Sequence, residues 1–227
     1  MLSWIGIGHL CGFLYLFVLL TSVLSKGLAG APLDPEDVSN TLGAVAKGRK
    51  RFRISIALDL VSHASVVALA GALFVAFSPY NRSLALVAML WRVVEGTIIA
   101  FNEVNNTVLL AVAQKRVSAT GAEVVALETL GRALIVAEDW GFKIGLAFFA
   151  LGSLLFGILF VFSGAVPPAL AWWGAVAGLL AVGGRWLALF SPNVPVILET
   201  ASFVPIILFE VVFGIWLLFR GGQIGLS

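Results

Sequence analysis

The sequence predicts an all-α membrane protein, a bundle of about six transmembrane helices with two short amphipathic connecting helices. Hydrophobic residues make up 60% of the 227-residue chain and charged residues only 11%, against roughly 25% charged residues in an average soluble domain. Several apolar runs reach the roughly 18 residues that cross the hydrocarbon core as a helix. They are too long for a membrane barrel, whose strands alternate over about 10 residues.

We expect a single transmembrane helical domain over residues 1–227, and proline, glycine, serine and asparagine mark the breaks between its spans. The first apolar segment could instead be a cleaved signal peptide, because Ala29-Gly30-Ala31 follows it. No basic residue precedes this segment and Pro32 would directly follow the cut, so we treat it as the first span. The expected spans are 4–25, 52–78, 83–113, 141–163, 168–191 and 196–219.

Two connections between the spans are expected to be helical. In the first, Asp34 is suited to cap a helix and Pro35 to begin it, and the helix should run to about Gly48. In the second, residues 120–123 form the pattern of a capping box, and apolar residues at helical spacing follow up to Ile135. This helix could lie along the membrane surface or the end of the bundle, or it could be a solvated connector.

Lys and Arg residues are distributed unevenly between the two sides of the membrane. Because basic loops tend to stay in the cytoplasm, this count places both termini outside, and an even number of spans places them on the same side. The basic side carries Lys26, Lys47, Arg49, Lys50, Arg51, Arg53, Lys115, Arg116 and Arg132, and the other side carries Arg82 and Arg220.

Polar residues within the spans are candidates for a site, because an ionisable group in a membrane needs a partner or a water-filled cavity. A stripe on the third span projects within an arc of roughly 100° and should face the interior of the bundle. Its members are Arg92, Glu95, Asn102, Glu103 and Asn106. The second span carries a shorter patch of Asp59, Ser62 and His63, and on the sixth span Glu199, Ser202 and Glu210 share a face. The fifth span contains the single charged residue Arg185.

The depth of these residues predicts which of them meet. Antiparallel spans bring the early residues of one beside the late residues of the next, at about 1.5 Å rise per residue. Measured from the start of the third span, Arg92 and Glu210 lie at about 13 and 15 Å, which predicts an ion pair. A deeper charged layer at about 25–31 Å comprises Asp59, Glu103, Lys143, Arg185 and Glu199.

These residues support two interpretations. They could form a structural network whose polar contacts hold the helices together, or they could line a functional cavity. Acids outnumber bases among them, so at least one buried carboxylate should need a proton or a bound cation. The candidate binding residues are Asp59, His63, Arg92, Glu95, Asn102, Glu103, Asn106, Arg185, Glu199 and Glu210.

No motif in the sequence assigns catalytic residues, a metal site or a cofactor. It has neither the G-x-S-x-G pattern of a nucleophilic serine nor a phosphate-binding glycine loop. The single cysteine, Cys11, excludes an internal disulfide, and His9 and His63 differ too much in depth to hold a haem. A net charge of +2 gives no indication of nucleic-acid binding. The fifth span contains Gly174-x-x-x-Gly178, which favours packing within the chain over a dimer interface.

Several segments, taken in order, carry a resemblance to a known family. In the first half they are Cys11-Gly12-Phe13-Leu14-Tyr15, Phe52-Arg53-Ile54, Asp59, Tyr80-Asn81 and Trp91-Arg92-Val93-Val94-Glu95. In the second half they are Gly141-Phe142-Lys143-Ile144-Gly145, Phe149, Gly157, Ser163, Pro167, Pro192, Glu210 and Trp216-Leu217-Leu218-Phe219-Arg220-Gly221. The chain thereby resembles an uncharacterised bacterial membrane family, domain of unknown function 4386. The resemblance implies a membrane protein of six or seven helices and carries over no activity, substrate or catalytic residue.

The chain departs from the pattern of that family in two places. Family members tend to begin with basic residues and to carry basic residues beside the proline turn after the fourth span. Residues 1–10 and 163–168 of this chain contain no Lys or Arg. The family features suggest cytoplasmic termini, whereas the count of basic residues on this chain favours termini outside.

The residues alone leave three functions open. The lack of a recognisable reaction centre favours a structural or accessory subunit of a membrane assembly over an enzyme. The polar stripe favours a transporter or receptor for a small molecule or ion. A membrane-embedded enzyme acting on lipid would use the deeper charged layer. The expected surroundings are the lipid bilayer of a bacterial cell membrane and other membrane protein subunits.

Overall fold

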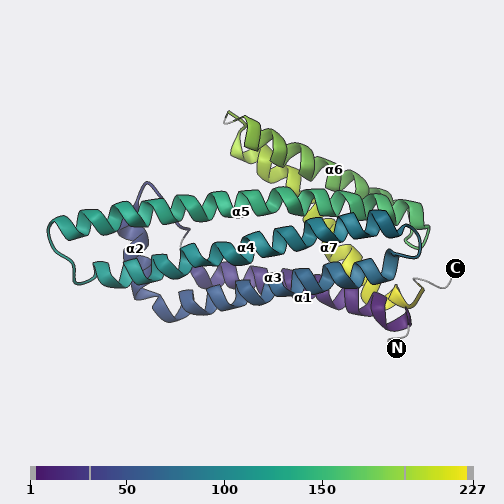
Figure 1. The fold of residues 1–227 in the computed structure, drawn as a ribbon, viewed down its shortest axis with the longest axis horizontal. Helices are drawn as coiled ribbons and strands as arrows, with labels where there is room; N and C mark the ends of the chain where they lie inside the picture. The colour runs from purple at the N-terminus through teal and green to yellow at the C-terminus, as the bar shows by residue number, and fades with distance from the viewer. Residues whose placement is uncertain (1–3, 31, 192, 224–227) are drawn as a thin grey trace. The chain divides into compact units, whose positions relative to one another are not determined.

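The computed structural model describes residues 4–30, 32–191 and 193–223, and this part of the chain contains helices and no strands (Figure 1). Six of its helices are long and apolar enough to cross a membrane, which confirms the predicted fold class and makes the protein a multi-pass membrane protein. The helices are α1 (Trp4–Ala29), α2 (Val38–Lys47), α3 (Arg49–Phe77), α4 (Arg82–Arg116), α5 (Ala122–Ser163), α6 (Pro168–Phe190) and α7 (Val196–Arg220), followed by the short 3₁₀ helix η1 (Gly221–Gln223).

Helix α2 is the first predicted connecting helix, and it begins later than expected. Its N-cap is Asp37, whose side chain accepts a hydrogen bond from the Asn40 backbone N–H at 3.3 Å. Asp34, the predicted cap, instead accepts from the Glu36 N–H at 2.8 Å and belongs to the turn before the helix. An aspartate side chain can satisfy the backbone of a turn or of a helix end, and sequence spacing does not distinguish the two.

The second amphipathic segment is helical, as predicted, but it is not a separate helix. It forms the first part of α5, which continues without a break for 42 residues. The expected boundary near residue 140 contains no proline, and ending a helix there would leave backbone groups without partners. Gly141 does not end the helix, and it lies against the side chain of Asn102 on α4.

The chain forms two compact units. Unit 1 consists of Met1–Leu19, Ala64–Gly96 and Ile144–Ser227, and unit 2 consists of Leu20–His63 and Thr97–Lys143. Unit 1 therefore contains all of α6 and α7, and unit 2 contains all of α2. The polar stripe of the third span is divided between them, because α4 contributes to both.

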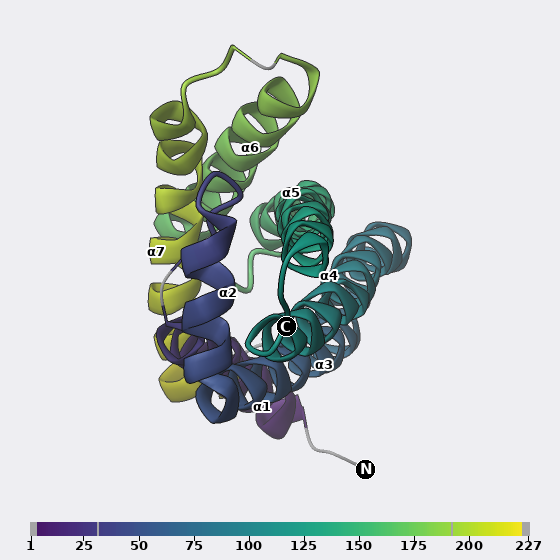
Figure 2. The same cartoon turned by 90° about the vertical axis from the view of Figure 1, so that its left-hand side faces the viewer.

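Phenylalanine side chains fill the core of unit 1. The ring centroid of Phe160 lies 4.8 Å from that of Phe77 and 4.7 Å from that of Phe213. A further ring, Phe209, stacks on Phe213 at 5.1 Å. Lipid tails are as apolar as these rings, so dispersion and ring geometry hold this core together more than exclusion from water does. Helices α6 and α7 lie side by side within this unit (Figure 2).

Glycine residues on α6 let its neighbours approach closely. A Cβ atom on Gly178 would lie 2.7 Å from the Leu154 Cα on α5, and a Cβ atom on Gly174 would lie 2.6 Å from the Phe209 ring on α7. The G-x-x-x-G motif of α6 therefore packs against helices of the same chain, which is the arrangement that the sequence favoured.

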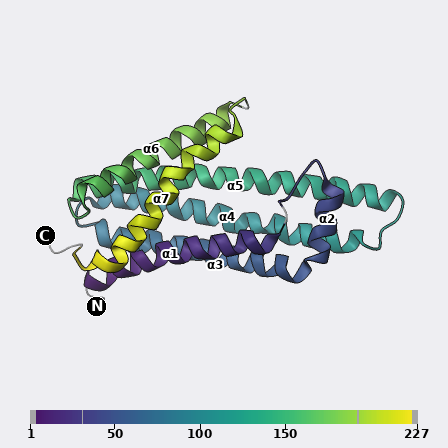
Figure 3. The ribbon, with the colours of Figure 1, turned by 180° about the vertical axis from the view of Figure 1, so that it is seen from behind.

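The start of α1 and the end of α7 are in contact within unit 1 (Figure 3). Gly8 lies so close to Gly221 that a Cβ atom on Gly221 would lie 2.7 Å from the backbone nitrogen of His9. The His9 ring Nδ1 donates a hydrogen bond to the Leu218 carbonyl oxygen at 2.8 Å. The first and last spans are therefore paired at these ends.

In unit 2, α2 runs across the direction of α3, α4 and α5 (Figures 1 and 3). Its Leu42 is fully buried, and a Cβ atom on Gly131 of α5 would lie 3.1 Å from Leu42 Cδ1. The first part of α5 also places Leu127 and Ile135 in the core of this unit. This amphipathic segment thus packs one face against α2 within unit 2.

Substitution of Gly178 by alanine should destabilise the protein by about 1–3 kcal/mol, because the new methyl group would overlap the backbone of Leu154. A Cβ atom on Gly183 of the same helix would have no neighbouring atom within 4 Å. Gly183→Ala is therefore the matched control and should not reduce stability. Unfolding in mixed detergent micelles, followed by circular dichroism, measures the difference. Equal stability of the two variants would contradict the close α5–α6 packing.

Candidate functional site

Arg92 of α4 is the centre of a buried polar network in unit 1. It is 4% exposed, and Gly152 on α5 leaves room for its side chain. Its Nε lies 3.2 Å from Glu95 Oε2, and its Nη2 lies 3.9 Å from Glu210 Oε1 on α7. The contact with Glu210 confirms the ion pair predicted from depth.

Other groups of unit 1 complete the surroundings of the Arg92 guanidinium group. Its Nη1 donates a hydrogen bond to Ser153 Oγ at 3.3 Å, and its carbon atom lies 4.5 Å from the ring centroid of Phe149. A guanidinium group with ion-pair, hydrogen-bond and cation–π partners is well satisfied by protein alone. This network has the character of structural contacts between α4, α5 and α7.

Arg185 and Glu199 form a second buried ion pair in unit 1, which links α6 to α7. Arg185 is 5% exposed, and its Nη1 contacts Glu199 Oε1. The guanidinium carbon lies 5.2 Å from the ring centroid of Phe203. Glu199 occupies the first turn of α7, where the helix dipole favours a negative charge. These two members of the predicted deeper layer therefore pair with each other.

Asn102 of α4 joins α4 to α5 in unit 2. Its Nδ2 donates a hydrogen bond to the Glu138 backbone oxygen at 2.8 Å, and its Oδ1 accepts one from Asn105 Nδ2 at 2.8 Å. Both ends of the amide thus have protein partners. Asn102 was a candidate binding residue, and its contacts are those of a residue that holds two helices together.

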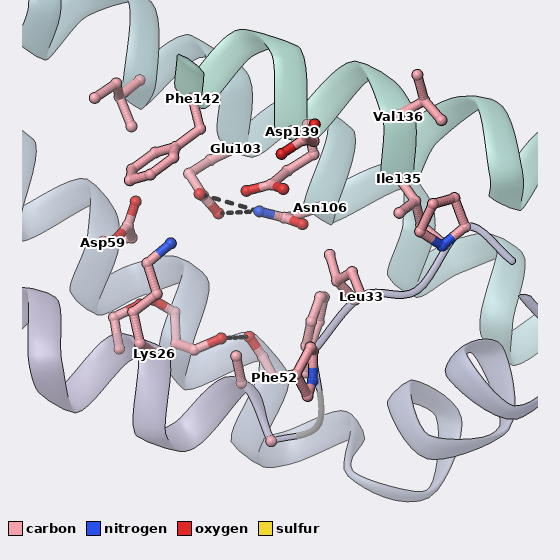
Figure 4. A pocket seen from close by; sticks show the side chains of 18 residues that line it. Lys26, Leu33, Phe52, Asp59, Glu103, Asn106, Ile135, Val136, Asp139 and Phe142 are labelled. Carbon is pink, nitrogen blue, oxygen red and sulfur yellow. Dashed lines mark hydrogen bonds between the residues drawn. The ribbon is translucent and has the colours of Figure 1, made fainter. Parts of the chain in front are cut away.

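A cavity of about 580 Å³ lies among α1, α3, α4 and α5 within unit 2 (Figure 4). Sites for small molecules have volumes of roughly 300–1,000 Å³. Three of the predicted site residues, Asp59, Glu103 and Asn106, line this cavity. The lining also contains the charged residues Lys26, Glu138 and Asp139, and the larger apolar residues Leu33, Phe52, Ile99, Ile135, Val136 and Phe142.

Two of the cavity acids are held by neighbouring polar groups. Glu103 is 7% exposed, and both of its carboxylate oxygens accept hydrogen bonds from Asn106 Nδ2, at 3.1 and 3.2 Å. The Asp59 side chain is 13% exposed, and its Oδ2 lies 3.3 Å from His63 Nδ1. The same His63 nitrogen donates to the Asp59 backbone oxygen at 2.8 Å. His63 therefore contacts Asp59 and is not itself among the lining residues.

The remaining charges at the cavity come from α1 and α5. The Lys26 ammonium group lies 4.2 Å from the ring centroid of Phe142. Asp139 accepts a hydrogen bond from Lys143 at 2.7 Å, and its side chain is 52% exposed. In the part of the chain that the structure describes, no group of three or more His, Cys, Asp and Glu residues could hold a metal ion.

The structure confirms that the polar stripe of the third span is buried, since its five residues are 4% to 8% exposed. It separates the candidate residues by environment. Arg92, Glu95, Glu210, Arg185 and Glu199 make ion pairs in unit 1, whereas Asp59, Glu103 and Asn106 border the cavity of unit 2.

Sequence reasoning missed Lys26, Glu138 and Asp139 as site residues. Lys26 was counted only as a basic residue after the first span, and the two acids fell in the expected connection before residue 141. The signal that could have found the acids is the lack of any helix-breaking residue between the amphipathic segment and the next span. A continuous helix places these two acids one turn before Phe142 and Lys143.

The family model described as domain of unknown function 4386 matches residues 10–221. The chain belongs to this family. The match confirms the resemblance found in the sequence, and it includes every residue of the cavity and of the Arg92 network named above. No curated protein and no solved structure matches the chain. For this member of the domain of unknown function 4386 family, function must therefore be argued from the site.

Substitution of Arg92 by methionine should destabilise the protein by about 3–5 kcal/mol, because it leaves Glu95 and Glu210 buried without their cation. The double variant Arg92→Met, Glu210→Gln should recover part of that loss, because it removes one of the two unpaired carboxylates. Detergent-titrated unfolding measures both variants.

Arg82, the exposed first residue of α4, supplies the control for loss of a positive charge on the same helix. Arg82→Met should change stability by no more than about 0.5 kcal/mol. If Arg92→Met loses no more stability than the control, the buried network does not hold unit 1 together.

Proposed function

We propose that this protein binds a small molecule in the cavity of unit 2 and acts as a transporter or receptor in the membrane. The observation that carries this proposal is an open cavity of about 580 Å³ among membrane helices, lined on one side by charged groups and on another by apolar ones. Ligand sites commonly combine an apolar lining with a few polar groups that converge on it.

The contrast between the two units supports this function over a purely structural one. Ionisable groups in a membrane protein are retained where they pair with one another or face a water-filled cavity. In unit 1 the buried cations Arg92 and Arg185 have carboxylate and aromatic partners. In unit 2, Asp59 and Glu103 border open volume instead. Structural contacts between helices explain the ion pairs of unit 1. They do not explain the cavity of unit 2.

We also propose that the protein lies in a bacterial cell membrane with both termini on the same side. Six spans require the same side for both ends, whichever way the bundle is inserted. The contact between Gly8 at the start of α1 and Gly221 after α7 supports this arrangement.

A cavity-filling substitution tests the function. Ile99 lines the cavity and is 2% exposed, so Ile99→Phe should fill part of the site and weaken binding by about tenfold or more. Val104 on the same helix is 51% exposed and outside the cavity lining, so Val104→Phe is the matched control and should bind like the native protein.

The probes are a phenylbutyl chain that carries an ammonium, a hydroxyl or a carboxylate group. Each is titrated calorimetrically against the full chain in lipid nanodiscs, with empty nanodiscs to subtract partitioning into lipid. Binding of at least one probe that is lost in Ile99→Phe and kept in Val104→Phe supports the proposal. If no probe binds the native protein, or if both variants bind alike, the site is not a ligand site, and an accessory subunit becomes the better interpretation.

A further inference from the structure

The charges that border the cavity of unit 2 are unbalanced toward the acidic side. The lining contains the carboxylates of Asp59, Glu103, Glu138 and Asp139 and a single cation, Lys26. Two basic residues outside the lining contact these acids, namely Lys143 beside Asp139 and His63 beside Asp59. Even if both count as cations, four carboxyl groups face three basic groups, so one carboxyl group is left that needs a proton or a cation from elsewhere.

Asn106 adds an independent observation, because it has an acceptor atom that no described residue uses. It is 8% exposed and lines the cavity. Its Nδ2 donates to both oxygens of Glu103, which fixes the orientation of the amide, since a carboxylate can only accept. The amide oxygen Oδ1 then lies on the other side, is buried, and accepts no hydrogen bond from the described residues. A buried acceptor in this state favours a ligand that brings an N–H or O–H donor.

The other side of the cavity is apolar. Figure 4 shows Leu33, Phe52 and Ile135 together, apart from the group formed by Lys26, Asp59 and Phe142. A ligand that fills this volume therefore needs a hydrocarbon or aromatic part as well as a polar group. The volume of about 580 Å³ is far larger than a hydrated metal ion needs, so the excess negative charge points to an organic cation.

The position of Lys26 is compatible with a cationic ligand. Its ammonium group lies 4.2 Å from the Phe142 ring centroid and so has a cation–π partner of its own. An anionic ligand could pair with Lys26, but it would bring its charge among Glu103, Glu138 and Asp59, and like charges at short range repel.

From these observations we propose that the ligand is an organic ammonium ion with an apolar body, whose N–H groups donate to Asn106 Oδ1 beside the acidic residues of the cavity. This inference rests on the proposed function, because it names the class of molecule that occupies the same cavity. The ammonium group donates to Asn106 and compensates the excess carboxylate, while the apolar body lies against Phe52, Leu33 and Ile135.

The native protein in nanodiscs gives the first test, which needs no variant. Phenylbutylammonium should bind about tenfold tighter than the uncharged phenylbutanol of similar size, and phenylbutanoate should bind more weakly than either. Phenylbutyltrimethylammonium has the same charge and no N–H group, so it should bind more weakly than the primary ammonium ion. Alcohol or carboxylate probes that bind as tightly as the ammonium ion would overturn the inference.

Two variants then assign the effect to residues. Glu103→Gln should reduce the preference for the ammonium ion over the alcohol by about tenfold, because it removes a carboxylate from the cavity. Asn106→Leu should weaken binding of the primary ammonium ion more than binding of the trimethylammonium ion. The control is Glu123→Gln, which removes an exposed carboxylate of α5 that pairs with Lys115 at 3.1 Å and should leave all affinities unchanged. Gel filtration and circular dichroism check that each variant is folded.

The outcomes separate this inference from the proposed function. If the alcohol or the carboxylate binds best and Ile99→Phe still abolishes binding, the cavity is a ligand site and the cation is the wrong class. If none of the four probes binds the native protein, the proposed function itself fails. A preference for the ammonium ion that is unchanged in Glu103→Gln and Asn106→Leu would place the cation elsewhere and overturn the inference.

Discussion

The cost of placing a charge in hydrocarbon is the constraint on which the rest of this structure depends. No water is present in the bilayer core to solvate a carboxylate or a guanidinium group, so each one must find protein partners or open volume. Arg92 shows the first solution, since Glu95, Glu210, Ser153 and the Phe149 ring all contact it. Asp59 and Glu103 of unit 2 show the second, since they border a cavity. One helix, α4, supplies residues to both arrangements.

Hydropathy and helical geometry were sufficient to predict the membrane fold and one tertiary contact. The six spans follow from the length of the apolar runs, because only a helix satisfies its own backbone in lipid. The Arg92–Glu210 contact followed from counting the rise per residue along antiparallel spans. That count works because both residues lie within long, unbroken helices, where register error does not accumulate.

The cavity could not be derived in the same way, because it depends on which helices pack beside which. Depth alone grouped Arg185 and Glu199 with Asp59 and Glu103, and only packing separates them into an ion pair and a cavity lining. Glu138 and Asp139 were not predicted as site residues for a different reason. Secondary-structure reasoning divides a chain where composition changes, whereas α5 passes from an amphipathic to an apolar composition without ending.

The length of α5 has a consequence for the level at which the cavity lies in the membrane. A helix of 42 residues is about twice as long as the roughly 20 residues that cross the hydrocarbon core. Its one long stretch without an ionisable residue is 144–163, so the hydrocarbon core fits that stretch. Glu138 and Asp139, which line the cavity, then lie beyond the end of that stretch, on the side of the lipid headgroups. On the proposed function, a charged ligand would enter from the aqueous phase without first dissolving in hydrocarbon.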